Sequence, residues 1–439
     1  MRFFSRLLLA LSAFCAFAVP VFPQSVVSNV WENTGIYSSV YAPYVFREVE
    51  DTPAPKGYKP FYISHYGRHG SRRQTESNAR RAYDVFLRAD AAGLLTGTGR
   101  DLLRDMTTLI KDHEGQYGEL TPRGAMEHRT LARRMARRFR PVFRNRHRRD
   151  VFCQSSTFSR CLVSMNHFSN SLQLLEPSLR FEFATGDRYL EILAHDFYRS
   201  KEIFSSDERM YDSLMRAGND PKPILERFFL DDPARMRKVV PDTVLLLKGL
   251  YTLGAICGCV DYLGIDLFTK YFTEEEVRAM AIPYTNRIYG NYGNSVEFGD
   301  RCSWAAKWLL EDIVRRADMA LADGSACAAD LRFGHDTGIM PLAALIGLGD
   351  MGTKLPRATA HLHFNTAERM TMASNIQMIF YRNRAGEVLV KFLYNEDEVP
   401  LTPLQPVSGP YYRWTEVRPY FVDLFSDKTP PLATSRNEK

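Results

Sequence analysis

The sequence is poor in cysteine and lacks the paired spacing of a zinc site. Seven cysteines occur in 439 residues, and one of them, Cys15, lies in an apolar leader. Cys257 and Cys259 are close together, but no second Cys or His pair follows nearby. The 45 % hydrophobic content is enough for a core without a metal or a disulfide. We expect no metal and no cofactor; an even number of remaining cysteines permits disulfides but favours no pairing.

The N-terminal apolar run is too short for a membrane anchor. Residues 7–19 are apolar, follow a basic start and precede polar residues from Gln24, whereas a membrane-spanning helix needs about 20 apolar residues. This pattern predicts a signal peptide over residues 1–23 and a periplasmic or secreted protein with no integral membrane segment after cleavage. Cys15 also permits a lipoprotein, although Phe14 stands where a small residue is expected.

Internal repeats and low-complexity tracts are absent, and the net charge is a modest +6. That charge does not indicate a nucleic-acid partner, but it favours small anionic substrates if it is focused in a cleft. One block is strongly basic, since residues 123–149 contain eleven arginines and one glutamate. This block is either a surface that attracts an acidic polymer or a solvated helix face whose apolar stripe (Leu131, Met135, Phe139) meets the core.

Strand and helix patterns alternate along most of the chain. They predict an α/β protein with a central, mainly parallel sheet flanked by helices and with an inserted, smaller all-α cap domain. The expected core comprises residues 25–189 and 295–426, the cap 190–294, and a disordered tail 427–439. Strands are predicted at 150–154, 179–183 and 328–334, and a hairpin at 376–382 and 388–394. Thr273 begins a capping box, and the Gly/Asn-rich residues 286–299 predict a loop.

A β-type run at residues 61–63 leads into a loop that contains Arg68, His69 and Arg72. Ligands of open α/β sheets lie at the carboxyl ends of strands. Two guanidinium groups can bind phosphate oxygens as planar forks, and a neutral imidazole between them could attack phosphorus. The alternative is a basic surface turn with a solvated histidine. His65 precedes His69 by four residues, but a strand and turn would not bring both rings to one metal.

Two other predicted strands end in polar groups of the same kind. Arg160 follows strand 150–154, and His335 and Asp336 follow strand 328–334. Phosphoryl transfer needs a nucleophile, cations on the phosphate oxygens and a proton for the leaving group. Together the three strand ends could supply all of these. His335 could also be an ordinary core histidine.

Four segments occur in the order of a known family signature. They are residues 68–72 (Arg-His-Gly-Ser-Arg), 118–124 (Gly-Glu-Leu-Thr-Pro-Arg-Gly), 156–164 (which contains Arg160) and 334–336 (Gly-His-Asp). On these segments the chain resembles the histidine acid phosphatase family, the branch of the histidine phosphatases that contains phytases. Residues 331–335, 373–382 and 411–414 are similar to multiple inositol polyphosphate phosphatases of gut bacteria. The chain departs from that group at His335-Asp336-Thr337, where His-Ala-Glu is usual, and at Gln74, where Pro is common.

The resemblance implies a role for each matched residue. His69 is the nucleophile that forms a phosphohistidine, and Asp336 protonates the leaving alkoxide and then activates water. The phosphate oxygens are held by Arg68, Arg72, Arg160 and His335. Further candidates for the substrate pocket are Gln74, Arg80 and Thr337, although Arg80 fits an exposed helix face equally well.

These observations predict a monomeric phosphomonoesterase that acts on a small-molecule substrate. The favoured substrates are inositol polyphosphates such as phytate, hydrolysed through a phosphohistidine. The alternative is a broad-specificity acid phosphatase acting on sugar phosphates, which the Asp336 pattern supports. A non-catalytic protein that binds an acidic polymer through residues 123–149 would need a missing catalytic group, and none is missing.

Overall fold

A mixed β-sheet forms the centre of the computed structural model, which describes residues 34–195 and 208–431. The strand order is β3-β2-β4-β1-β5-β6-β7, with β8 paired to β6. Strands β3, β2, β4 and β1 are parallel, whereas β5 is antiparallel to β1 and forms the predicted hairpin with β6. The α/β prediction is confirmed. The strands are β1 (Lys59–Arg68), β2 (Asp150–Ser155), β3 (Arg180–Ala184), β4 (Cys327–Gly334), β5 (Asn375–Arg382), β6 (Val388–Tyr394), β7 (Asp397–Glu398) and β8 (Tyr411–Arg413).

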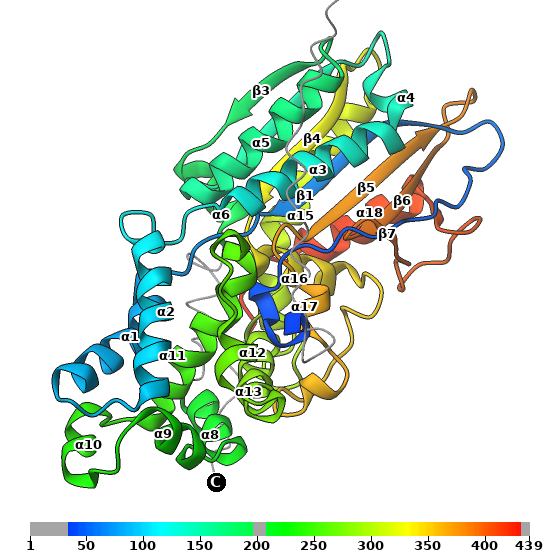
Figure 1. The fold of residues 1–439 in the computed structure, drawn as a ribbon. Coiled ribbons are helices and arrows are strands. Elements are labelled where there is room, and N and C mark those ends of the chain that lie inside the picture. Colours follow the sequence, from blue (N-terminus) through cyan, green and yellow to red (C-terminus); the bar gives the residue numbers. More distant parts are fainter. Residues whose placement is uncertain (1–33, 196–207, 432–439) are drawn as a thin grey trace, which may run out of the picture.

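Helices cover both faces of the sheet (Figure 1). One face carries α3 (Pro122–Arg138), α4 (Arg140–Phe143) and α5 (Ser159–Leu175). The other carries α6 (Asp187–Leu193), α15 (Lys307–Leu321), α16 (Asp336–Ile346) and α18 (Trp414–Ser426). Because β1 is covered on both sides, its last eight residues are all buried. Its side chains alternate, with Ile63 in the core of the α3–α5 face and Tyr62 and Tyr66 in the core of the other.

The helical part of the molecule is larger than predicted. It contains α8 (Glu208–Gly218), α9 (Lys222–Phe228), α10 (Pro233–Val239), α11 (Thr243–Ile256), α12 (Leu267–Tyr271) and α13 (Glu274–Tyr292). Helices α1 (Glu76–Ala91) and α2 (Gly97–His113), expected in the sheet core, pack here instead, with α1 along α11 (Figure 1). The assignment of residues 76–113 to the core is therefore wrong, because an amphipathic pattern reveals an apolar face but not the element that covers it.

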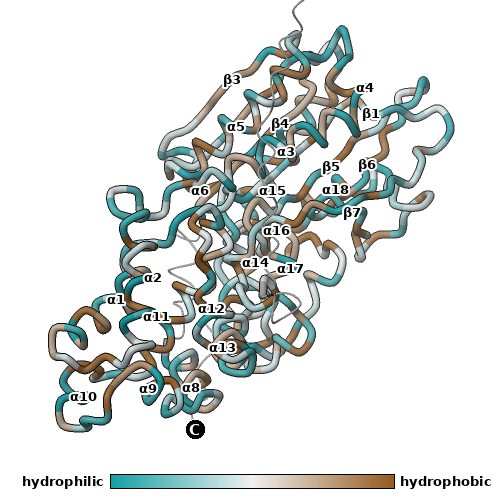
Figure 2. Tube along the Cα trace, in the orientation of Figure 1, coloured by the Kyte–Doolittle hydropathy of each residue, from teal (hydrophilic) through white to brown (hydrophobic). Residues whose placement is uncertain are grey.

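One continuous hydrophobic core joins the helical part to the second face of the sheet. It includes Phe86 of α1, Leu250 of α11, Tyr66 of β1 and Ile339 of α16. Hydrophobic segments accordingly occur in both parts of the chain (Figure 2). The segment Thr243–Leu263 is long and apolar enough to cross a membrane, but 83 % of its apolar window is buried inside the protein. The segment is a helix of the protein core, which agrees with a sequence that is apolar on all sides.

Short elements connect these helices and the sheet. They are the 3-10 helices η1 (Thr34–Tyr37), η2 (Ser39–Tyr41), η4 (Cys257–Leu263) and η5 (Ala360–Leu362), with α14 (Asp300–Trp304) and α17 (Thr366–Arg369). The six cysteines from Cys153 to Cys327 are all free thiols. The predicted signal peptide, residues 1–23, lies outside the described residues.

Two local predictions are wrong. The expected loop at 286–299 is helical as far as Tyr292, because buried Asn286 is held by tertiary hydrogen bonds to Ala358 O and from His361 N. The capping box of this helix, between Thr273 and Glu276, is present as predicted. The tail does not leave the protein at residue 427, since the Trp304 indole donates to Lys428 O at 3.1 Å. Residues 432–439 lie outside the described part.

Internal contacts engage much of the basic block of residues 123–149. Four of its arginines form ion pairs with carboxylates elsewhere in the chain, and Arg148 donates to two backbone carbonyls. The pairs are Arg123–Asp261, Arg134–Glu396, Arg138–Asp51 and Arg144–Glu176. These arginines attach α3 and α4 to their neighbours, which weakens the interpretation of the block as a surface for an acidic polymer.

The α1–α11 contact depends on a glycine. A Cβ atom on Gly249 would lie 2.6 Å from Ala82 N and 2.9 Å from Ala82 Cβ. We expect Gly249→Ala to lower the free energy of unfolding by about 1–3 kcal/mol, since overpacking of a tight helix contact forces the backbones apart. Gly97→Ala is the matched control, because a Cβ on Gly97 meets no atom within 4 Å. Equal unfolding transitions of both variants in urea would contradict this packing argument.

Candidate active site

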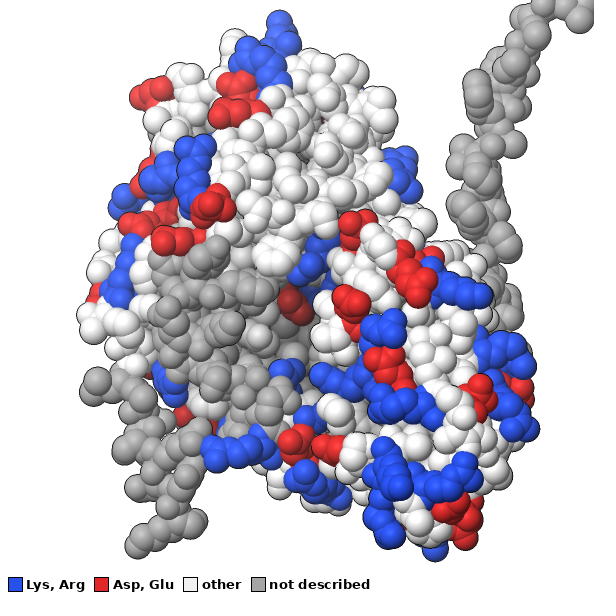
Figure 3. Space-filling view, turned by 90° about the vertical axis from the view of Figure 1, so that its left-hand side faces the viewer, with Lys and Arg blue, Asp and Glu red and all other residues white. Residues whose placement is uncertain are grey.

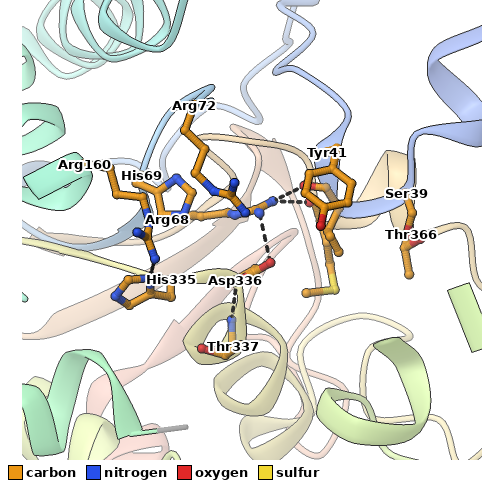
Figure 4. A network of polar contacts seen from close by, with 12 residues as sticks. Ser39, Tyr41, Arg68, His69, Arg72, Arg160, His335, Asp336, Thr337 and Thr366 are labelled. Carbon is orange, nitrogen blue, oxygen red and sulfur yellow. Dashed lines mark hydrogen bonds and ion pairs between the residues drawn. The ribbon is translucent and has the colours of Figure 1, made fainter. Parts of the chain in front are cut away.

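Three parallel strands bring the predicted site residues to one edge of the sheet. Arg68 is paired in register with Gly334, and Ser155 with Phe333, so β1, β2 and β4 end at the same level. The loop after β1 carries His69 and Arg72, the turn after β2 leads to Arg160 in α5, and β4 leads directly to His335 and Asp336. The structure therefore brings together all six residues expected to bind or transfer phosphate (Figure 4).

The orientation of the His69 imidazole leaves one ring nitrogen available. Its Nδ1 lies 2.9 Å from Gly70 O. A carbonyl oxygen only accepts hydrogen bonds, so Nδ1 carries the proton and Nε2 keeps its lone pair. Burial, together with Arg160, Arg68 and Arg72, lowers the pKa of His69 well below its usual value. This lowered pKa favours the neutral form of the ring, which is the nucleophilic one.

Arg68 is buried at the centre of the site. Its Nη1 donates to Val40 O at 2.7 Å and to Met370 O at 2.8 Å, while its Nη2 forms a 2.9 Å ion pair with Asp336 (Figure 4). The carbonyl of Val40 comes from η2 and that of Met370 from the loop before β5. The guanidinium of Arg68 thus sets the position of the Asp336 carboxylate.

Arg72 and Arg160 have no carboxylate of this kind, although Arg72 Nη1 donates to Arg73 O at 2.8 Å. Within residues 34–195 and 208–431, neither forms an ion pair with a carboxylate, and their Nε atoms are buried without a hydrogen-bond partner. Burial and the neighbouring Arg72 lower the pKa of Arg160 to about 10. Arg160 nevertheless remains charged at neutral pH. The site thus contains three guanidinium groups and one carboxylate, and this excess of positive charge favours a bound anion.

His335 and Asp336 stand where β4 passes into α16. Asp336 is the first residue of the helix, and its Oδ1 accepts from the Thr337 N–H at 3.1 Å. The Nδ1 atom of His335 lies 3.5 Å from Arg160 Nη2, and its Nε2 lies 3.2 Å from Ser156 Oγ. Because a guanidinium only donates, Nε2 carries the His335 proton. Burial and the arginines lower the pKa of His335 well below its usual value.

The surface is hollowed between the two parts of the molecule, and both basic and acidic side chains are visible in the hollow (Figure 3). Within the described residues, no three His, Cys, Asp or Glu side chains gather as the ligands of a metal ion would. The groups that can act chemically at the strand ends are thus imidazoles, guanidiniums and one carboxylate.

The three candidate pocket residues are placed differently from one another. Gln74 is fully buried, donates to Thr252 O of α11 at 3.1 Å and accepts from the Thr75 N–H. Its Oε1 also lies 3.5 Å from Arg72 Nη1, so Gln74 connects the loop of residues 69–74, here called the phosphate loop, to the helical part. Arg80 is 39 % exposed and pairs with Asp84 one turn along α1. Thr337 is buried next to Asp336, and its carbonyl lies 3.0 Å from His195 Nε2.

A carboxylate that the sequence analysis did not single out supports the phosphate loop. Glu127 of α3 is fully buried and accepts from Ser71 N and Ser71 Oγ, both at 2.7 Å. The sequence offered one indication of this role, because Glu127 is the one acidic residue in the basic block of residues 123–149. The same helix must also approach closely, since a Cβ on Gly70 would lie 2.6 Å from Gly124 O. A Cβ on Gly124 would in turn clash with the backbone of Ser71, which accounts for the glycine that ends residues 118–124.

Known proteins are similar to this chain in sequence and in fold. The sequence model of the histidine phosphatase superfamily (branch 2) matches residues 67–238. The chain is similar to multiple inositol polyphosphate phosphatase 1 of Gallus gallus, with 23 % identity over 396 residues, which cover 85 % of this chain and 84 % of the relative.

Two solved structures share the fold. The multiple inositol polyphosphate phosphatase of Bifidobacterium longum, in complex with inositol hexasulfate, has a TM-score of 0.74 and 20 % identity, covering 87 % of this chain and 96 % of that one. The phytase from D. castellii has a TM-score of 0.64 and 16 % identity, covering 92 % and 89 %.

The charge state of the nucleophile can be tested directly. We expect the His69 imidazole to stay neutral as the pH falls through about 6.5, where an unperturbed histidine titrates, because burial and three arginines lower its pKa. The measurement is a pH series of ¹⁵N imidazole NMR spectra, with the His69 signals assigned by their loss in His69→Gln. A titration of His69 centred near pH 6.5 would contradict the electrostatic description of the site.

Proposed function

We propose that this chain is a phosphoric monoester hydrolase of the histidine phosphatase superfamily, which hydrolyses inositol polyphosphates such as phytate through a phosphohistidine. The observation that carries the proposal is the His69 imidazole, whose Nδ1 proton is held by Gly70 O while its Nε2 is free among three arginines. Such a cradle binds a phosphoryl group and presents a nucleophile to it.

The first half-reaction transfers the phosphoryl group to the enzyme. Arg68, Arg72 and Arg160 hold the phosphate oxygens together with His335. Nε2 of His69 attacks phosphorus, and the bond between phosphorus and the inositol oxygen breaks. Asp336 acts in its protonated form in this step, having taken up a proton from solvent, and its carboxyl gives that proton to the leaving oxygen, so that an alcohol departs rather than an alkoxide.

The second half-reaction returns the enzyme to its starting state. The Asp336 carboxylate takes a proton from water, and the water oxygen attacks the phosphohistidine. The P–N bond breaks, inorganic phosphate leaves, and Nε2 of His69 regains its lone pair. Arg68 supports both steps, because its 2.9 Å contact with Asp336 fixes the position of the carboxyl group.

Two lines of support favour inositol polyphosphates as substrates. The proteins named above are inositol polyphosphate phosphatases and a phytase. The site is also more cationic than one phosphate needs, and Arg80 can extend it. Arg80 lies beside Tyr117, which precedes Gly118, and a Cβ on Gly118 would lie 3.8 Å from Arg160 Nη1. A substrate with several phosphates could therefore contact both arginines.

A broad-specificity acid phosphatase acting on sugar phosphates is the second candidate. The observation that favours it is the proton donor, because Asp336 follows His335 directly instead of the His-Ala-Glu arrangement.

We further propose that the enzyme acts in the periplasm or outside the cell, a proposal supported by the basic start and apolar run of residues 1–19.

The roles of the nucleophile and the acid lead to different variant phenotypes. We expect His69→Ala to abolish phosphate release from both phytate and p-nitrophenyl phosphate. Asp336→Asn should lower kcat for phytate by about 10²–10⁴-fold, the usual contribution of a positioned acid, and should affect p-nitrophenyl phosphate less because its leaving group needs no proton. His147→Ala, in an exposed turn, is the control. Substantial turnover by His69→Ala would refute the mechanism.

Substrate range can be tested through Arg80. We expect Arg80→Gln to raise the KM for phytate about two- to fivefold, the effect of losing an exposed ion pair, and to leave the KM for p-nitrophenyl phosphate unchanged. Arg418→Gln on α18 removes an exposed, Asp-paired arginine on another helix and should change neither value. Equal efficiency of the wild type on phytate and on a panel of sugar phosphates would instead favour the broad-specificity enzyme.

A further inference from the structure

Arginines with little exposed surface have different partners in this protein. Outside the site, Arg332 pairs with Asp312 at 2.8 Å, whereas Arg148 donates to backbone carbonyls and lies over the Phe61 ring. At the site, Arg72 and Arg160 have no carboxylate partner among the described residues but lie against aromatic rings. The guanidinium carbon of Arg72 is 5.6 Å from the centre of the Tyr41 ring. That of Arg160 is 4.9 Å from the centre of the Phe158 ring.

The Tyr41 ring is itself fixed from several sides. It is 3 % exposed, and its hydroxyl accepts from the Tyr284 hydroxyl of α13 at 3.1 Å. Its backbone carbonyl accepts from Cys259 Sγ at 3.2 Å. The preceding residue, Val40, supplies the carbonyl that holds Arg68. The η2 segment therefore contacts two of the three site arginines, one through a carbonyl and one through a ring (Figure 4).

Phe158 lies against Arg160 as Tyr41 lies against Arg72. It is the N-cap residue of α5, two positions before Arg160. Its ring also meets the His335 ring edge to face, with 4.9 Å between centroids. Phe158 thus contacts two of the groups that hold phosphate, just as the η2 segment does.

An aromatic ring beside an arginine affects anion binding differently from a carboxylate beside it. A carboxylate would orient the guanidinium but would occupy its N–H groups and cancel its charge. The face of an aromatic ring attracts the cation while the N–H groups, which lie in the guanidinium plane, stay free. We propose that Tyr41 and Phe158 are positioning residues, which orient Arg72 and Arg160 toward the phosphoryl group while leaving their charge uncompensated. This inference rests on the proposed phosphatase function.

The test compares ring removal with ring retention at each position. Tyr41→Leu and Phe158→Leu remove the ring, whereas Tyr41→Phe and Phe158→Tyr keep it. We expect the leucine variants to raise the competitive inhibition constant of inorganic phosphate about three- to tenfold, the usual effect of losing a partly desolvated cation–π contact. KM for p-nitrophenyl phosphate should rise more than kcat falls. The ring-retaining variants should stay within about twofold of the wild type.

A matched control removes an aromatic ring from an arginine outside the site. Phe46 lies 5.8 Å from Arg134, which pairs with Glu396, so Phe46→Leu should leave phosphate inhibition unchanged. Folded leucine variants at positions 41 and 158 with wild-type inhibition constants would overturn the inference while the phosphatase function stands. If Tyr41→Leu does not fold, the Phe158 pair decides alone. A wild type that neither hydrolyses p-nitrophenyl phosphate nor binds phosphate would overturn the proposed function and this inference together.

Discussion

The buried guanidinium of Arg68 is the interaction on which the site depends. Two backbone carbonyls and one carboxylate surround it, and they come from three parts of the chain that lie far apart in sequence: Val40, Met370 and Asp336. A buried cation with these partners is stable only when all of them are in place, because each lost partner leaves charge unsolvated. Folding of the N-terminal segment, the loop before β5 and the start of α16 is thereby coupled to the formation of the phosphate cradle.

The order of the strands determines where the site lies, and contacts made by the loops determine the state and position of the side chains in it. Parallel pairing of β1 with β4 and of β2 with β4 places three strand ends together, which a reading of strand patterns can anticipate. The tautomer of His69 depends on a contact with Gly70 O, and the position of Asp336 depends on a side-chain contact with Arg68. Contacts of this kind have no signature in periodicity or composition.

Residues with strong local signals were therefore predicted well, and residues defined by tertiary contact were not. The Thr273 capping box, the β5–β6 hairpin and the groups at the strand ends all follow from short-range chemistry. The contact of Gln74 with α11 was not anticipated, and residues 286–292 were expected to be a loop but continue α13. Glu127 and Tyr41 were missed because their importance lies in their neighbours, Ser71 and Arg72, rather than in their own sequence context.

The shared core of the sheet and the helical part limits how this enzyme can move. Phe86, Leu250 and Ile339 belong to one hydrophobic cluster, and Gln74 joins the phosphate loop to α11 by a hydrogen bond. A hinge motion that separated the two parts would expose this apolar surface to water and would displace the phosphate loop. A continuous core of this kind therefore favours a rigid scaffold over a hinge motion between the sheet and the helical part.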